Sequence, residues 1–217
     1  MTDKAIRVLV VDDHHVVRRG LVALLNMEKG FQVVGEAADG GEAVAEHRRC
    51  DPDVTLIDLS LPEFSGVEVI RRVRRERFHA NFIVLTTYDG DEDIHQALRV
   101  GARAYLLKGV TREELMATLR IVHEGRLYIS PVIAAKLAQR VGTKELTPRE
   151  ADVLRQMAEG NSNKAIAKHL QIGEATVKTH INRLLSKLKV MDRTQAVMTA
   201  VRRGIVPLES LRSPSRR

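Results

Sequence analysis

The sequence predicts an α/β fold, a doubly wound five-stranded parallel sheet, followed by an all-α four-helix domain with a helix-turn-helix. In residues 1–125, short apolar runs alternate five times with segments of helical periodicity, as expected of successive βα units. Residues 145–206 show helical spacing instead. Residues 1–128 contain 18 Lys and Arg against 21 Asp and Glu, whereas residues 129–217 contain 17 against 7. This asymmetry indicates two domains, of which the basic one is suited to contact a polyanion.

The predicted strands are short runs rich in β-branched residues, such as IRVLVV at the start, and such runs are typical of strands buried on both faces. They cover residues 6–11, 31–36, 54–58, 82–87 and 104–107. The helices that follow them are predicted from apolar residues three and four positions apart, as in Leu21, Leu24 and Leu25. They cover residues 15–27, 41–49, 66–76, 91–100 and 111–123.

The two domains are joined by a predicted linker. It covers residues 126–144, with a short helix from 131 to about 140 that Gly142-Thr143-Lys144 interrupts. The second domain covers residues 145–206, and the tail 207–217 is expected to be flexible.

The second domain begins with a clear helix-start signal. Thr147 and Glu150 have the spacing of a capping box, with Pro148 at the first helical position. The four helices of this domain are predicted at residues 148–159, 163–170, 174–189 and 192–204. A short turn with a glycine joins the second helix to the third, and two short helices joined in this way are typical of a helix-turn-helix.

Polar side chains gather where the strands of the first domain end. They are Asp12, Asp13, Asp58, Thr86 and Lys108. In a doubly wound sheet these positions share the edge at which ligands bind, so the five side chains are expected to converge. Taken singly, each aspartate is better explained as a turn or cap residue, and the lysine as a solvated charge. Their coincidence at one sheet edge favours a functional site.

Converging carboxylates repel one another unless a cation lies between them, and Mg²⁺ prefers such oxygen ligands. We therefore expect Asp13 and Asp58 to bind Mg²⁺ directly, with Asp12 close by, directly or through water, and the carbonyl of Ser60 as a further ligand. Asp58 is also placed to be a nucleophile that forms an acyl phosphate. Lys108 would then contact the phosphoryl group as a point charge, and Thr86 would donate a hydrogen bond to it.

The helix at 174–189 has one apolar and one polar face. The apolar side chains that should be buried are Val177, Ile181, Leu184, Leu185 and Leu188. Near the start of the polar face lie three side chains that are expected to reach base edges of DNA, namely Lys178, Thr179 and Asn182. Four others are better suited to contact phosphates, namely Lys164, Thr176, Arg183 and Lys187. For any single exposed lysine, the alternative is an ordinary solvated charge.

The first domain resembles the receiver domains of two-component signalling, which have a flavodoxin-like sheet. The resemblance is carried by the segments VVDDH from Val10, DLSLP from Asp58, VLTT from Val84 and GARAYLLK from Gly101. It implies that Asp58 accepts phosphate from a sensor histidine kinase. It also implies that Thr86 and Tyr105 form a switch pair, with the hydroxyl moving toward the phosphate and the ring turning inward.

The second domain resembles the DNA-binding domains of the LuxR/NarL/FixJ class. The matching segments are LTPRE from Leu146, GNSNKAIA from Gly160 and TVKTHIN from Thr176. The resemblance implies a four-helix domain that binds double-stranded promoter DNA as a homodimer, with the fourth helix supplying part of the dimer contact. Both resemblances together indicate a response regulator of the NarL/FixJ class, a DNA-binding transcription regulator and not an enzyme.

Three alternatives remain open at this point. A Mg²⁺-dependent phosphohydrolase would also use an aspartyl phosphate, but its acidic motif and nucleophile would follow the first strand. A LuxR-type regulator that senses a small ligand would not need the acidic cluster. A regulator that acts without phosphorylation could keep the pocket.

The sequence also predicts a cytoplasmic protein without a membrane segment. It has a single cysteine, no apolar run of membrane-spanning length and no signal-peptide pattern.

Overall fold

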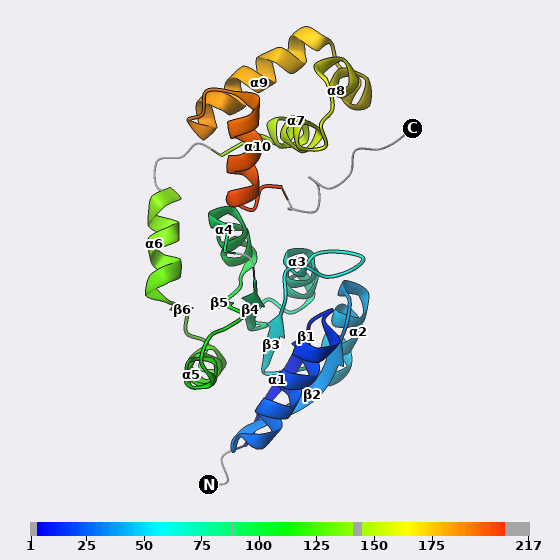
Figure 1. Cartoon of the computed structure of the whole chain (residues 1–217). Coiled ribbons are helices and arrows are strands. Elements are labelled where there is room, and N and C mark those ends of the chain that lie inside the picture. Colours follow the sequence, from blue (N-terminus) through cyan, green and yellow to red (C-terminus); the bar gives the residue numbers. More distant parts are fainter. Residues whose placement is uncertain (1–3, 88, 141–144, 207–217) are drawn as a thin grey trace. The chain divides into compact units, whose positions relative to one another are not determined.

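The computed structural model describes residues 4–87, 89–140 and 145–206. The chain divides into two compact units. The first, here called the sheet unit, contains the β-sheet and, among the described residues, comprises 4–87 and 94–135; the second, the helical unit, contains the last four helices (Figure 1). The predicted interruption at 142–144 and the predicted flexible tail lie outside the described residues.

The sheet unit contains one parallel sheet with the strand order β2-β1-β3-β4-β5-β6. Its strands are β1 (Ile6–Val11), β2 (Phe31–Ala37), β3 (Val54–Ile57), β4 (Phe82–Thr86), β5 (Ala104–Leu107) and β6 (Tyr128–Ile129). The order reverses between β1 and β3, because the chain leaves β1 toward β2 and then returns to the other side of β1. The predicted doubly wound parallel sheet is therefore confirmed, and its ligand-binding edge lies at the carboxyl ends of β1 and β3.

The sheet has six strands among the described residues, and the prediction of five was wrong. The additional strand, β6, pairs in parallel with β5, with Tyr128 opposite Ala104. It lies in the segment that the sequence predicts to be a linker. Two residues are too few to show a period-two pattern, so no sequence signal of a strand existed here.

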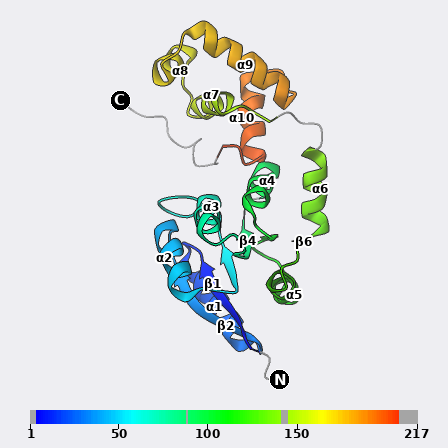
Figure 2. The ribbon, with the colours of Figure 1, turned by 180° about the vertical axis from the view of Figure 1, so that it is seen from behind.

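The helices associated with these strands are α1 (His15–Met27), α2 (Gly40–Cys50), α3 (Gly66–Glu76), α4 (Asp91–Val100), α5 (Arg112–His123) and α6 (Pro131–Arg140). Their bounds differ from the predicted ones by one residue at most. Helices α1 and α5 pack on one face of the sheet, where Leu25 and Leu119 join the apolar side chains of β1, β3, β4 and β5 in a single core cluster. Figure 2 shows the same ribbon from behind.

The helical unit contains α7 (Pro148–Ala158), α8 (Asn163–Leu170), α9 (Glu174–Leu188) and α10 (Arg193–Arg202) around its own apolar core. The predicted capping box is present, because the Thr147 hydroxyl accepts from the Glu150 backbone and the Glu150 carboxylate accepts from the Thr147 backbone. Helix α9 ends one residue before the predicted position, because Lys189 adopts a left-handed conformation with φ of 56°. No helix in the described part of the chain is long and apolar enough to cross a membrane.

Candidate functional site

The acidic cluster lies at the carboxyl ends of β1 and β3, where the strand order reverses. Asp12 directly follows β1 and Asp58 directly follows β3, and the Asp58 backbone N–H donates to the carbonyl of Val11 at 2.9 Å. This bond extends the ladder between the two strands by one step and holds both aspartates at the same level. Both side chains are almost completely buried, with 1% of Asp12 and 2% of Asp58 exposed. Buried carboxylates need a compensating charge.

Lys108 supplies that charge. It follows β5, and its backbone N–H donates to the carbonyl of Thr86 at 2.8 Å. Its Nζ lies 2.7 Å from Asp12 Oδ2 and 2.5 Å from Asp58 Oδ2. Burial alone would lower the pKa of Lys108, but the hydrogen bonds to Asp12 and Asp58 raise it above its ordinary value. The lysine is therefore a charged group that bridges the two buried carboxylates.

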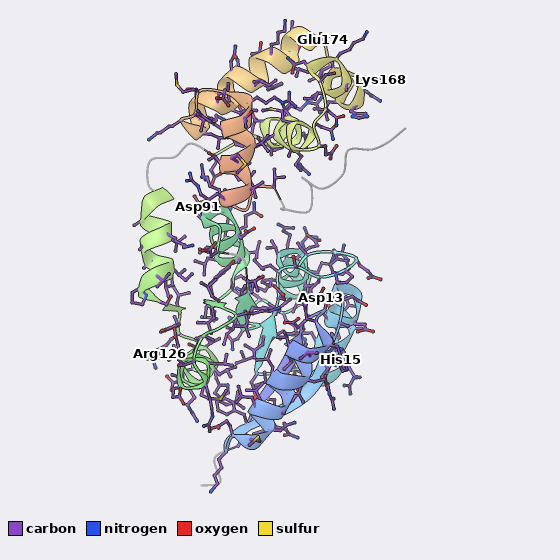
Figure 3. All side chains as sticks on the ribbon, in the orientation of Figure 1. Asp13, His15, Asp91, Arg126, Lys168 and Glu174 are labelled. Atoms are coloured by element: carbon purple, nitrogen blue, oxygen red, sulfur yellow. The ribbon has the colours of Figure 1, made fainter. Side chains whose placement is uncertain are left out.

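Asp13 and His14 complete the cluster on its solvent side. His14 Nδ1 lies 2.7 Å from Asp13 Oδ1 and 3.4 Å from Asp12 Oδ1. One ligand atom from each of Asp12, Asp13, His14 and Asp58 can be chosen so that all four lie within 4.8 Å of one another. Three carboxylates so close together are suited to a hard divalent cation such as Mg²⁺. Figure 3 labels Asp13 just before α1, and His15 on the first turn of that helix.

Two further predicted site residues are buried beside this cluster. Thr86 closes β4 and Tyr105 lies on β5, and neither side chain is exposed. The switch role that the receiver resemblance assigns to Thr86 and Tyr105 stays a prediction. Ser60 is exposed, and its backbone N–H donates to Asp58 Oδ1 at 3.3 Å. The structure thus brings Asp12, Asp13, Asp58 and Lys108 together at one sheet edge, with Ser60 in the adjoining loop and Thr86 at the end of β4.

The sequence interpretation missed a glycine that shapes this site. Gly66 begins α3, and its backbone N–H donates to the carbonyl of Leu59 at 2.9 Å. A Cβ atom at this position would collide with the carbonyl oxygen of Asp58. Only glycine therefore lets α3 begin directly against the loop that carries Asp58. A single glycine at the start of a helix gave no signal of this role.

The exposed face of α9 carries most of the predicted DNA contacts. The exposed ones are Lys164 on α8 and Thr176, Lys178, Thr179, Asn182 and Arg183 on α9. Of the apolar set, Val177, Leu184 and Leu188 are buried, whereas Ile181 and Leu185 are half-buried. In Figure 3, Lys168 and Glu174 mark the last turn of α8 and the first turn of α9, between which the chain turns.

Lys187 differs from the other predicted DNA contacts. Its Nζ lies 2.6 Å from Glu150 Oε2 and donates to the carbonyl of Glu145 at 3.0 Å. The Glu150 side chain is only 3% exposed, so this lysine compensates a buried charge inside the helical unit. Burial alone would raise the pKa of Glu150, but hydrogen bonds from Lys187 and Thr147 outweigh it and lower that pKa. The helical periodicity did not reveal this partner, because the two residues are 37 positions apart.

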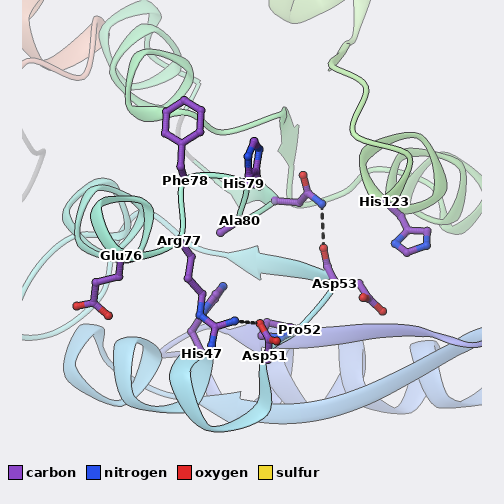
Figure 4. Close-up of a pocket in the computed structure, with 11 residues that line it drawn as sticks. His47, Asp51, Pro52, Asp53, Glu76, Arg77, Phe78, His79, Ala80 and His123 are labelled. Carbon is purple, nitrogen blue, oxygen red and sulfur yellow. Dashed lines mark hydrogen bonds and ion pairs between the residues drawn. The ribbon is translucent and has the colours of Figure 1, made fainter.

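Apart from the acidic cluster, the sheet unit has an open pocket of about 510 Å³ at the amino ends of β3 and β4 (Figure 4). His47 of α2 lines it and is 3% exposed, and its ring stacks on Phe82 with centroids 5.7 Å apart. His47 Nδ1 has no hydrogen-bond partner among the described residues. Burial first, and then the charge of Arg77, lower the pKa of His47. The sequence interpretation did not single out this histidine.

Two protein families match this chain, one over the domain with the acidic cluster and one over the domain with the exposed face of α9. The family described as "Response regulator receiver domain" matches residues 8–120, and "Bacterial regulatory proteins, luxR family" matches residues 144–200. The chain therefore belongs to the response regulators, and it combines a receiver domain with a LuxR-type DNA-binding domain. This family consists of transcriptional regulators of two-component systems.

Similar proteins share this organisation along almost their whole length. The chain is 42% identical to the uncharacterized transcriptional regulatory protein YhcZ of Bacillus subtilis, over 90% of this chain and 95% of that protein. It is 36% identical to the nitrate/nitrite response regulator protein NarL of Escherichia coli K12, over 88% of this chain and 93% of that protein. Among solved structures, the response regulator RcsB in complex with DNA matches 92% of this chain and 99% of that chain, with 25% identity and a TM-score of 0.68.

Proposed function

We propose that Asp58 is the phospho-acceptor of this response regulator and that a sensor histidine kinase is its phosphodonor. The observation that carries this proposal is the position of Lys108 Nζ, which lies 2.5 Å from Asp58 Oδ2 and 2.7 Å from Asp12 Oδ2. An ammonium group in this position is within hydrogen-bond reach of the oxygens of a phosphoryl group on Asp58. It can exchange a carboxylate partner for a phosphoryl oxygen without leaving the site.

The reaction would be an in-line transfer between two covalent carriers. A carboxylate oxygen of Asp58 attacks the phosphorus of a phosphohistidine, and a P–O bond forms as the P–N bond breaks. The imidazole leaves with the electron pair of that bond and takes up a proton. Lys108 binds a phosphoryl oxygen, and the Thr86 hydroxyl donates a hydrogen bond to another.

The residues of the acidic cluster fit a Mg²⁺ site. Asp13 and Asp58 would supply carboxylate oxygens, the Ser60 backbone a carbonyl oxygen, and Asp12 an oxygen directly or through water. The ion would offset the negative charge that the carboxylates and the phosphoryl oxygens bring together. Among the three carboxylates Asp13 is the most accessible, with 32% of its side chain exposed, so it is the carboxylate that an incoming ion first meets.

We propose that phosphorylation acts through Thr86 and Tyr105 on dimerisation and on binding of promoter DNA. Thr86 ends β4 and Tyr105 lies on the adjacent strand β5. A movement of the Thr86 hydroxyl toward the phosphate would therefore change the space available to the Tyr105 ring. In the helical unit, the exposed face of α9 would enter the major groove, with Lys178 and Asn182 at base edges. The active DNA-bound form would be a homodimer in the cytoplasm.

The proposal is tested by phosphorylating the full chain with a small-molecule phosphodonor and Mg²⁺. Mass spectrometry should locate one acyl phosphate, on Asp58, and Asp58→Asn should abolish it, while the exposed carboxylate variant Asp51→Asn should leave it unchanged. Undiminished labelling of Asp58→Asn at another residue would refute the assignment. DNA affinity measured before and after labelling then separates a phosphorylation-controlled regulator, in which it changes, from a regulator that merely retains the pocket.

A further inference from the structure

His14 contributes the only nitrogen donor of the metal-binding group that the described residues form, and the function proposed above does not use it. It lies between the acidic cluster and solvent, with 63% of its side chain exposed. We propose that His14 Nδ1 is a ligand of the divalent cation in this site. This inference rests on the metal role proposed above and deepens it, because it makes the site selective for transition-metal ions over Mg²⁺.

The distances around His14 are those of neighbouring ligands on one ion. In an octahedral site with bonds of about 2.1 Å, adjacent donors are about 3.0 Å apart and opposite donors about 4.2 Å apart. His14 Nδ1 lies 2.7 Å from Asp13 Oδ1 and 3.4 Å from Asp12 Oδ1. The four donors of the group all lie within 4.8 Å of one another. Small side-chain adjustments therefore suffice to bring them onto one ion.

The backbone already holds His14 in this position. It caps α1, and its N–H donates to Asp12 Oδ1 at 2.9 Å, which ties the residue to the buried carboxylate. Lys108 occupies the other oxygens, Asp12 Oδ2 and Asp58 Oδ2. The Oδ1 atoms of both aspartates accept backbone N–H groups, from His14 and Ser60, and each keeps a lone pair for a cation that the imidazole also binds.

The donor set determines which ion is favoured. Carboxylate, carbonyl and water ligands suit Mg²⁺, whereas an imidazole nitrogen adds affinity for ions such as Co²⁺, Ni²⁺ and Zn²⁺. A neutral imidazole can carry its proton on Nε2 and offer the Nδ1 lone pair to the ion. If His14 instead only oriented Asp13 by a hydrogen bond, its loss would weaken all divalent ions alike. Selectivity between ions therefore separates a ligand from a positioning residue.

The test is calorimetric titration of the full chain with Mg²⁺ and with Co²⁺, together with the visible absorption spectrum of the Co²⁺ form. The variants are His14→Ala, the matched control His15→Ala on the adjacent exposed histidine, and Asp13→Asn. We expect His14→Ala to weaken Co²⁺ by about tenfold or more, since even losing a hydrogen-bond partner behind a ligand weakens metal binding roughly 10- to 100-fold. In the same variant we expect the Mg²⁺ affinity to change by less than about twofold and the Co²⁺ absorption spectrum to shift. His15→Ala should change neither the two affinities nor the spectrum.

Each other outcome overturns a defined part of this reasoning. Equal losses of Mg²⁺ and Co²⁺ affinity in His14→Ala, or no loss of either, would overturn the ligand role while leaving the metal site intact. An effect of His15→Ala as large as that of His14→Ala would assign the Co²⁺ to a surface histidine site. If neither ion binds the unmodified chain, or if Asp13→Asn binds both unchanged, the metal role in the proposed function fails and this inference with it.

Discussion

Replacing Lys187 by alanine should destabilise the helical unit, although the sequence alone predicts this lysine to be a phosphate contact on DNA. The structure places its Nζ 2.6 Å from Glu150 Oε2 and 3.0 Å from the Glu145 carbonyl oxygen. Truncation would leave the carboxylate of Glu150 buried without its counter-charge. Because that carboxylate belongs to the capping box of α7, the damage should appear at the start of α7 and where α9 packs against it.

The size of the effect can be estimated from the burial of the pair. Removing one partner of a buried ion pair typically costs about 3–5 kcal/mol. Two features reduce this value: the Lys187 side chain is 21% exposed, and Glu150 keeps the hydrogen bond from the Thr147 backbone at 2.8 Å. We therefore expect a loss of about 2 kcal/mol, which corresponds to roughly 30-fold in an opening equilibrium.

The sign of the pH dependence follows from the lowered pKa of Glu150. A carboxylate with a depressed folded-state pKa stabilises the fold above its unfolded value of 4.5, and this stabilisation is lost as pH falls through the folded-state pKa. Without Lys187, only the hydrogen bonds from Thr147 oppose the effect of burial, so the pKa of Glu150 is less depressed. The variant should therefore lose stability mainly at neutral pH and differ less from the unmodified chain in acid.

Amide hydrogen exchange followed by mass spectrometry is the suitable assay. The chain has no tryptophan, and its three tyrosines lie outside the helical unit, so intrinsic fluorescence would report the sheet unit alone. Peptides from α7 and α9 should exchange roughly 30-fold faster in Lys187→Ala. The control Lys178→Ala, on the exposed face of the same helix, should exchange normally, and Glu150→Gln should make the Lys187 substitution less harmful. Normal exchange in Lys187→Ala, together with DNA binding that weakens and loses salt dependence, would show that Lys187 is free to contact phosphate.

Three further results are expected. The free energy of unfolding should fall as the pH is lowered from 7.5 to 5.5, because burial lowers the pKa of His47 and the ring takes up a proton when the chain unfolds. In denaturant titrations, His47→Leu should flatten this part of the pH profile. An equal fall in the variant would refute the assignment to His47. Alanine at Lys178 or Asn182 should weaken binding to a selected operator by about 1–3 kcal/mol more than to random DNA, whereas Lys164→Ala should weaken both equally and reduce the salt slope by about one unit. Val177→Asp, at a fully buried position, should unfold the helical unit, and normal helical circular dichroism would contradict its place in the core.

The sequence was most informative about features that depend on the ends of predicted strands or on residues close together in the chain. Asp12, Asp58 and Lys108 could be placed at one sheet edge because the carboxyl ends of parallel strands must share that edge. The capping box of Thr147 and Glu150 could be read because its two hydrogen bonds are local.

What the sequence did not reveal depends on contacts between distant segments. The Lys187 contact to Glu150 joins residues 37 positions apart, and the stacking of His47 on Phe82 joins a helix to a strand that is three elements further on. Such contacts form only when the helices pack in the folded structure, so neither periodicity nor motif spacing could indicate them.

The short strand β6 has a consequence for where the receiver domain can be cut. Its Tyr128 backbone N–H donates to the Arg103 carbonyl at 2.8 Å, and the Tyr128 hydroxyl lies 3.1 Å from Glu114 Oε1 on α5. A fragment that ends at residue 125 keeps every element of the five βα units but uncovers the free edge of β5. An uncovered strand edge is a template for pairing with another chain. We therefore expect a receiver fragment that ends at residue 125 to self-associate through β5 even though its phosphorylation site is complete, and a fragment that extends beyond Ile129 to remain monomeric in size-exclusion chromatography.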